Sequence, residues 1–405
     1  MTRRTFLVIC MAWFAVMAHH AAVFLKVTNP SGLQRQEVME WDACQVWKSL
    51  GVEEGTELIV KNAFGQTVTY QVTHDKKLLL DVSLLPDGKA EFTVEKGWKT
   101  DMKPSVFGKL YRYRAEDVAW ENDITAYRVY GPALQRRGEQ AYGIDVWLKS
   151  TKDLDVDRRY ALDYQYNIDV QELRKQGKEN AIDFMNTKVS FHLDHGTGLD
   201  CYNVGPSLGC GTPAVILADS IVMPYCYKDF EILDNGPLRF TLQLTFPKVN
   251  IDGREVTEHR IISLDKGCYF NRMEVWYDGF AKPVDVCGGV VVHTKEAKDL
   301  TLGKDFIAYD DPTDSPERHN FQIYTGLVFP DANVKTRLVK DPWHKRQGIE
   351  GNAVGVRKAM KPGEHFVYWF GASWCQSGTP DHDFWLMQIK RFVETCRQPV
   401  KTWVE

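Results

Sequence analysis

The sequence predicts a mainly β protein that is built from two unequal parts. Short runs in which apolar and polar residues alternate recur along the chain, most clearly over 238–246. Turn residues such as the Pro-Asp-Gly at 86–88 separate these runs. The alternation of long helices and strands that is typical of doubly wound folds is missing. We therefore expect antiparallel sheets whose strands each carry one polar face.

The composition is that of a globular protein with a large core. The 405 residues include 30 Gly and 17 Pro, with 44% hydrophobic and 26% charged residues, which excludes collagen-like, low-complexity and wholly disordered chains. Twelve Trp, 17 Tyr and 20 Phe supply bulky side chains for the interior. A net charge of −4 offers no basic excess for a phosphate backbone, so we expect no nucleic-acid partner.

The first 18 residues have the pattern of a cleaved signal peptide. Arg3 and Arg4 precede an apolar stretch over 5–18, and the small residues Val16 and Ala18 mark a cleavage site. The stretch is too short to span a membrane, and no later segment is as long as a span requires, so we expect no stable membrane insertion. Ile9 precedes Cys10 where a lipid-anchor site needs a small residue. We predict a periplasmic or secreted protein.

The first part of the mature chain, 22–98, is predicted to be a small β-sandwich. Alternating runs at 57–61, 67–72, 78–82 and 90–94 are separated by turn residues. One short helix is expected over 43–50, because Asp42 is a suitable N-cap and Gly51 stands where a C-terminal glycine belongs. Residues 99–106 are predicted to form a linker.

The second part, 107–405, is predicted to be a larger antiparallel β domain. Strands are expected at 124–130, 238–246, 272–277, 289–293 and 366–370. A helix capped by Asp381 or Asp383 is expected over 384–396, where Trp385 and Ile389 belong to one apolar stripe. A last strand is expected over 400–404.

Cysteine spacing and the missing nucleotide motifs restrict the cofactors. Of nine Cys, one lies in the signal peptide, and the others are expected to be mostly buried and structural. Cys201 and Cys210 are the first pair to examine for a disulfide. No pair has zinc spacing, and no Gly-rich nucleotide fingerprint or serine-hydrolase elbow occurs. The sequence requires no cofactor, although its His and Asp residues are compatible with a divalent metal.

Two polar clusters carry most of the functional signal. In the first, Trp-Glu-Asn-Asp at 120–123 leads into a strand on which Arg128 and Tyr130 share a mostly apolar face. Arg128 is interpreted either as a partner of a buried carboxylate or as a donor for a substrate carboxylate or sugar hydroxyls. The second cluster, 192–211, contains five glycines, which let the backbone approach a ligand. It is interpreted as a rigid turn-rich loop, a metal site, or a metal-free sugar or catalytic site.

Within the second cluster, His192 and Asp194 are expected on one face of a preceding strand, with His195 pointing elsewhere. Farther along, the polar face of the strand that carries Arg239 is either exposed to solvent or the floor of a cleft. A lone histidine such as His293 is more typical of a structural residue. The candidate binding residues are Trp120, Glu121, Asn122, Tyr130, Asp194, Asp200, Arg239, Glu258, His259, Arg260 and His293.

Several motifs taken together resemble one family. They are Trp-Glu-Asn-Asp at 120–123, Arg-x-Tyr-Gly-Pro at 128–132, Gly-Ile-Asp-Val-Trp at 143–147, and the Asp-His-Gly-rich run at 194–206. The chain resembles domain-of-unknown-function family 4861 from about residue 22 to the C-terminus. The resemblance implies a galactose-mutarotase-like β-supersandwich behind a small β domain. It also implies an exported protein of bacterial polysaccharide utilisation whose partner is an oligosaccharide or polysaccharide. Ile124 departs from the arginine that the family often carries.

The residues leave the reaction open among three hypotheses. The first is an enzyme on uronic-acid-containing oligosaccharides that works by β-elimination. Arg128 would bind the carboxylate, and His195 and Tyr202 would serve as base and acid, or the reverse. A hydrolytic variant would use a carboxylate pair drawn from Glu121, Asp194, Asp200 and Glu258.

The second hypothesis is a non-catalytic glycan-binding protein in which Trp120, Tyr130 and Tyr202 stack on sugars. The third is a sugar mutarotase that uses His195 and Glu258 as an acid–base pair.

Overall fold

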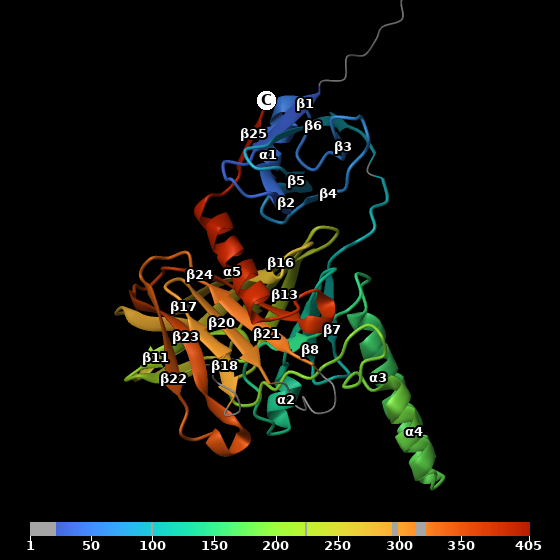
Figure 1. Cartoon of the computed structure of the whole chain (residues 1–405), viewed down its shortest axis with the longest axis vertical. Coiled ribbons are helices and arrows are strands. Elements are labelled where there is room, and N and C mark those ends of the chain that lie inside the picture. The colour runs from blue at the N-terminus through green and yellow to red at the C-terminus, as the bar shows by residue number, and fades with distance from the viewer. Residues whose placement is uncertain (1–21, 99, 223–224, 294–298, 313–320) are drawn as a thin grey trace, which may run out of the picture.

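The computed structural model describes residues 22–98, 100–222, 225–293, 299–312 and 321–405. The expected signal peptide lies outside the described residues. The prediction of a mainly β fold is confirmed, because strands of antiparallel sheets make up far more of the chain than helices do (Figure 1). None of the helices in these ranges is both long and apolar enough to cross a membrane.

The N-terminal part is a small sandwich of two sheets, and the last strand of the chain joins it. One sheet has the order β25-β1-β6-β3 and the other the order β2-β5-β4. Helix α1 has the predicted bounds and caps: Asp42 accepts a hydrogen bond from the Gln45 amide, and Gly51 is left-handed. The elements are β1 Val23–Thr28, β2 Arg35–Asp42, α1 Ala43–Leu50, β3 Leu58–Lys61, β4 Tyr70–Val72, β5 Lys77–Leu84, β6 Lys89–Lys96 and β25 Lys401–Val404.

The larger part is a β-supersandwich of three sheets. Their orders are β10-β9-β8-β7, β12-β11-β18-β23-β22, and β13-β14-β16-β17-β24-β21-β20-β19, with β15 paired to β16. The first sheet comprises β7 Phe107–Tyr111, β8 Asp117–Glu121, β9 Ala126–Val129 and β10 Asp145–Trp147.

The second sheet comprises β11 Cys210–Leu217, β12 Ser220–Val222, β18 Val284–His293, β22 Val334–Lys340 and β23 Ile349–Met360. The third comprises β13 Asp229–Asn235, β14 Arg239–Thr245, β15 Val249–Ile251, β16 Arg254–Asp265, β17 Phe270–Asp278, β19 Leu300–Leu302, β20 Phe306–Asp311, β21 Ile323–Val328 and β24 Phe366–Trp374.

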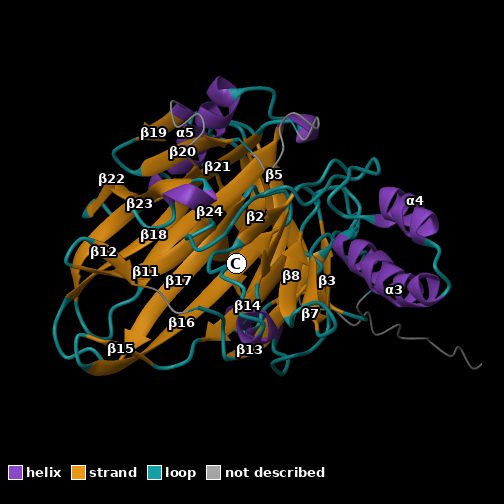
Figure 2. Ribbon diagram, turned by 90° about the horizontal axis from the view of Figure 1, so that it is seen from below, coloured by secondary structure: helices purple, strands orange, loops and turns teal. Residues whose placement is uncertain are grey.

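The helices of the larger part were only partly predicted. Helix α5, His382–Arg397, begins at the N-cap Asp381, which was one of the two caps predicted for a helix over 384–396. The sequence analysis missed α2 Pro132–Arg136, α3 Val156–Lys175 and α4 Glu179–Val189. Helix α3 buries few of its side chains and shows no continuous apolar stripe, so it lacks the usual sign of a helix. Figure 2 shows α3 and α4 together at one margin of the molecule.

The two parts are connected at both ends of the larger one. Residues 100–106 lead from β6 to β7, and α5 leads back to β25, which pairs with β1 (Figure 1). The division of the chain at 99–106 stays a prediction, and the pairing of β25 adds its residues to the N-terminal sandwich. Side chains also bridge the parts. Gln71 bonds the backbone of Arg239, and Lys266 pairs with Asp81 at 2.5 Å.

Gly211 offers a test of how tightly the sheets pack. It sits at an irregularity of β11 with φ +93°, and a Cβ there would come within 2.2 Å of the Phe370 Cβ. Gly253 has φ +78° but open space around it. We expect Gly253→Ala to cost about 1–2 kcal/mol through backbone strain alone, and Gly211→Ala to cost more than about 3 kcal/mol. Urea unfolding measures both costs, and equal costs would contradict the packing described.

Candidate functional site

The candidate site is built around the buried guanidinium of Arg128. Arg128 on β9 stands directly opposite Asp145 on β10 in the sheet register. Its Nε donates to Asp145 Oδ2 at 2.6 Å, and its Nη2 donates to Asp200 Oδ2 at 3.0 Å. Asp117 on β8 lies 3.7 Å from Nη1. Only 5% of the Arg128 side chain is exposed, so these carboxylates replace the water that a charged group needs.

Aromatic side chains enclose the same guanidinium. The rings of Tyr130 and Trp147 lie 4.9 Å and 5.2 Å from its central carbon. The Tyr130 hydroxyl donates to Asp145 Oδ2 at 2.8 Å and lies 3.4 Å from Arg128 Nη2. Tyr160 of α3 donates to Asp117 Oδ2 at 3.2 Å. Helix α3 therefore covers the polar face of the sheet formed by β7–β10.

Three carboxylates around one guanidinium leave the cluster with excess negative charge. Burial raises the pKa of Asp145 to about 6 and that of Asp117 also to about 6, although Arg128 opposes both shifts. Burial also raises the pKa of Tyr130 well above its usual value. The phenol therefore stays protonated near neutral pH, and the two carboxyls take up protons under mildly acidic conditions.

His192 forms the exposed edge of the cluster. Its Nδ1 lies 3.0 Å from the backbone carbonyl of Asp200 and 3.9 Å from the carboxylate of the same residue. A carbonyl can only accept, so Nδ1 carries the proton in the neutral ring and Nε2 keeps its lone pair. The side chain is 58% exposed. Its ring lies tilted against that of Phe191, with the two centroids 4.5 Å apart. Arg114 lies over the Phe191 ring, 6.0 Å from its centroid.

Three residues of the motif at 120–123 have structural partners. The Trp120 ring is fully buried between Tyr127 and Phe240, so no ligand stacks on it in this conformation. Glu121 forms a buried ion pair with Lys149 and accepts a hydrogen bond from the first amide of α3. Asn122 closes a turn and donates to the carbonyls of Asp265 and Cys268. None of these three side chains hydrogen-bonds to Arg128.

The Gly-rich loop contributes Asp200 and His192 to the site, and its other candidates lie elsewhere. The expected strand that would carry His192 and Asp194 is not formed, because turns follow α4 there. Asp194 accepts hydrogen bonds from the amides of Gly196 and Gly198. His195 is exposed and its Nε2 lies 3.0 Å from the Ser190 carbonyl. Tyr202 is buried in the main core, and burial raises its pKa well above the usual value.

Tyr202 lies near a second buried polar pair. His293 Nδ1 lies 2.9 Å from Asp311 Oδ2, and its Nε2 lies 3.2 Å from the Asn203 carbonyl. The residues from 198 to 205 thus place Asp200 against Arg128 and Asn203 against His293. Such a pairing agrees with the structural role expected of a lone histidine.

The remaining candidates belong to the third sheet of the larger part. Glu258 and Arg260 form an ion pair inside the core, with Arg260 packed 4.0 Å over the Phe246 ring, and burial raises the pKa of Glu258. His259 points to the opposite face and stacks on Trp276. Arg239 pairs with Asp265 and Glu40. It lines a cleft between the two parts of the chain, which was one of its two predicted alternatives.

The described residues show no metal or disulfide at the site. No group of three or more His, Cys, Asp or Glu side chains in those ranges is arranged to hold a metal ion, and a metal requirement stays untested. Cys201 and Cys210 are both buried and unbridged. The other cysteines that the structure describes are also unbridged, and four of them are only partly buried, namely Cys44, Cys268, Cys375 and Cys396.

Sequence reasoning missed three residues that complete the cluster. Asp145 was noticed only as part of the motif at 143–147, yet it stands opposite Arg128 in the predicted kind of sheet. Asp117 and Arg114 carried no motif. Their only sequence signal is position, since Asp117 begins a strand that pairs with the strand of Arg128.

Comparisons with known proteins place the chain in a family of unknown function. The model of a family described as a domain of unknown function, DUF4861, matches residues 27–402. The chain is 25% identical over 348 residues to "Uncharacterized protein P7" of Formosa agariphila, which covers 81% of this chain and 78% of that protein.

Two solved structures from Enterococcus faecalis are also similar. An alpha-mannosidase has a TM-score of 0.51 at 8% identity and covers 95% of this chain and 46% of its own. A protein in the glycosyl hydrolase family 38 has a TM-score of 0.49 at 8% identity, covering 95% and 47%. The chain thus spans about half the length of these two proteins. At such identity the likeness to the alpha-mannosidase shows a shared fold alone, in agreement with the predicted β-rich sandwich architecture.

The raised pKa of Asp117 generates a pH prediction. Between the usual value of 3.8 and about 6 the folded chain binds more protons than the unfolded chain, so this group lowers stability as the pH rises through that window. Asp117→Asn removes the effect and keeps an acceptor for Tyr160. We expect the variant to gain up to about 3 kcal/mol over the wild type between about pH 4 and pH 7. Urea unfolding across this range measures the gain, and a pH-independent difference would refute the assignment.

Proposed function

This chain belongs to the family described as a domain of unknown function, DUF4861, and from the residues of its candidate site we propose that it is a carbohydrate-active enzyme. Its substrate is a uronic-acid-containing oligosaccharide, which it cleaves by β-elimination. The observation that carries the proposal is the exposed imidazole of His192 beside the buried Tyr130–Arg128–Asp200 cluster. The fold that the chain shares with the solved alpha-mannosidase structure supports a glycan as the substrate class.

His192 is the general base of this reaction. The hydrogen bond of its Nδ1 to the Asp200 carbonyl leaves Nε2 as an acceptor, and the exposed ring is accessible to a substrate. The Asp200 carboxylate, 3.9 Å away, stabilises the imidazolium once the proton is taken. This replaces the assignment of the base to His195, which bonds the Ser190 carbonyl instead of the Asp200 segment that joins His192 to the cluster.

Tyr130 is the general acid, and Arg128 positions it. Nε2 of His192 takes the proton from C5 of the uronate, and the electron pair forms the C4–C5 double bond as the bond from C4 to its oxygen breaks. The leaving oxygen takes the phenolic proton of Tyr130, which water later restores from His192. Arg114, over Phe191 beside His192, neutralises the substrate carboxylate. Arg128 itself is occupied by Asp145 and Asp200 and holds the acid in place.

Hydrolysis is less well supported, because the carboxylates it would need have other partners. Asp145 and Asp200 bind Arg128 and are almost fully buried. Glu121 and Glu258 form internal ion pairs, and Asp194 closes a turn.

We also propose that the signal peptide at 1–18 directs the chain out of the cytoplasm. A polysaccharide substrate would be found there.

The experiment is a product screen by mass spectrometry. The mature chain is incubated with a panel of uronic-acid-rich oligosaccharides, together with His192→Ala and the matched control His195→Ala. We expect unsaturated products that absorb in the ultraviolet. His192→Ala should lower kcat by about 10²–10⁴-fold, whereas His195→Ala should keep the wild-type rate. Tyr130→Phe should also lower kcat, because it removes the acid and keeps the ring over Arg128.

The outcomes separate the alternatives. Saturated reducing ends would mean hydrolysis and would refute elimination. Activity that depends on His195 and survives His192→Ala would refute the assignment of the base. Oligosaccharides that stay unchanged across the panel would favour the glycan-binding protein over any enzyme.

A further inference from the structure

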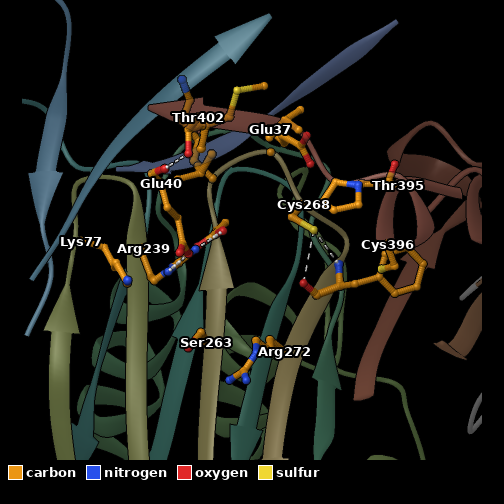
Figure 3. A pocket seen from close by; sticks show the side chains of 18 of the residues that line it. Glu37, Glu40, Lys77, Arg239, Ser263, Cys268, Arg272, Thr395, Cys396 and Thr402 are labelled. Carbon is orange, nitrogen blue, oxygen red and sulfur yellow. Dashed lines mark hydrogen bonds and ion pairs between the residues drawn. The ribbon is translucent and has the colours of Figure 1, made fainter. Parts of the chain in front are cut away.

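A large cleft lies between the N-terminal sandwich and the outer face of the third sheet. It has a volume of about 1180 Å³. Strand β2 and helix α5 form its walls, and strands β14, β16, β17 and β24 form its floor (Figure 3). No residue of the Arg128 cluster lines it. Clefts between parts of a chain are preferred places for ligands, and the proposed function makes no use of this one.

The floor of the cleft carries an ordered row of side chains. Thr241, Ser263, Arg272 and Trp369 occupy directly opposite positions on four adjacent antiparallel strands, so their side chains share one face of the sheet. Figure 3 shows Ser263 and Arg272 side by side at the bottom of the cleft. The row presents the Ser263 hydroxyl, one guanidinium and one indole, while Thr241 at its end is buried with its hydroxyl 3.4 Å from that of Ser263. Because neighbouring strands lie about 4.8 Å apart, it extends over roughly 14 Å.

The chemistry of the row suits a neutral, hydroxyl-rich ligand. Arg272 already pairs with Glu274 at 2.7 Å, and Arg239 at the edge of the floor already pairs with Asp265 and Glu40. A second anion would therefore gain little from either guanidinium, whereas sugar hydroxyls can donate to the carboxylates and accept from the guanidinium. Trp369 is half-buried, with its ring braced by Phe392 of α5, and offers an apolar surface to a sugar ring.

The walls of the cleft are held in place before a ligand arrives. The pair of Arg239 with Glu40 joins the floor to β2, and His74 bonds Asp234 across the same boundary at 2.7 Å. Arg35 of β2 donates to the Gln398 carbonyl just beyond α5 at 2.5 Å. A preformed site loses little conformational freedom on binding.

We propose that this cleft is a second glycan site, separate from the Arg128 cluster, which holds a neutral oligosaccharide segment across the row from Thr241 to Trp369. Its role is binding without chemistry. The inference goes beyond the proposed function and does not depend on His192.

The test is calorimetric titration of the mature chain with four neutral probes, namely cellohexaose, xylohexaose, mannohexaose and maltohexaose. We expect at least one to bind. Trp369→Ala should weaken that binding about tenfold or more, because it removes the stacking surface. Ser263→Tyr should weaken it similarly by filling the middle of the row while leaving Trp369 and α5 intact. The matched control Trp343→Ala changes an indole that is 86% exposed in a turn outside the cleft.

Each outcome decides the proposal. Binding that is lost in both cleft variants and kept in Trp343→Ala and His192→Ala supports it. It is overturned if none of the four probes binds, if binding survives both cleft variants, or if His192→Ala abolishes binding. The last result would place the sugar at the Arg128 cluster. The product screen with uronate oligosaccharides is independent, so either proposal can fail alone.

Discussion

Burial of the Arg128 guanidinium is the constraint around which the site is organised. A cation with 5% of its side chain exposed is stable only if carboxylates reach it, and three separate segments supply them. Asp145 comes from the strand on one side of β9, Asp117 from the strand on its other side, and Asp200 from a loop that follows α4. Fixing Asp200 fixes the loop, and the carbonyl of Asp200 then orients His192. The exposed histidine thus owes its orientation to a buried charge.

Local signals predicted much of the fold. Asp42 and Gly51 predicted both ends of α1, and Asp381 predicted the start of α5, because caps act over a few neighbouring residues. Strict alternation likewise predicted β14. Helices α3 and α4 were missed because little of their surface is buried, so no apolar stripe marks them. The pairing of β25 with β1 depends on residues far apart in the chain, and no local pattern carries it.

The site was predicted in outline but not in its roles. Three of the candidate residues do lie together, namely Arg128, Tyr130 and Asp200. For Arg128 and for Arg239, two alternatives were considered, and one of the two is the environment that the structure shows. Polar residues with structural partners have the same composition as functional ones, so Glu121 and Glu258 could not be separated from true site residues before their ion pairs were seen. The choice between His192 and His195 depends on the path of an irregular loop. Such a loop lacks the regular spacing of residues that predicts side-chain directions in strands and helices.

The place of β25 affects the order in which the chain can fold. Lys26 pairs with Glu405, 379 residues later, and β25 is the edge strand beside β1. A ribosome makes β1 long before β25, so one side of β1 stays unpaired until residues 401–404 have been synthesised. An unpaired strand edge is a template for aggregation, and contacts between such distant residues form slowly. Truncation before residue 401 would therefore leave an open edge on the N-terminal sandwich even if every other strand had formed.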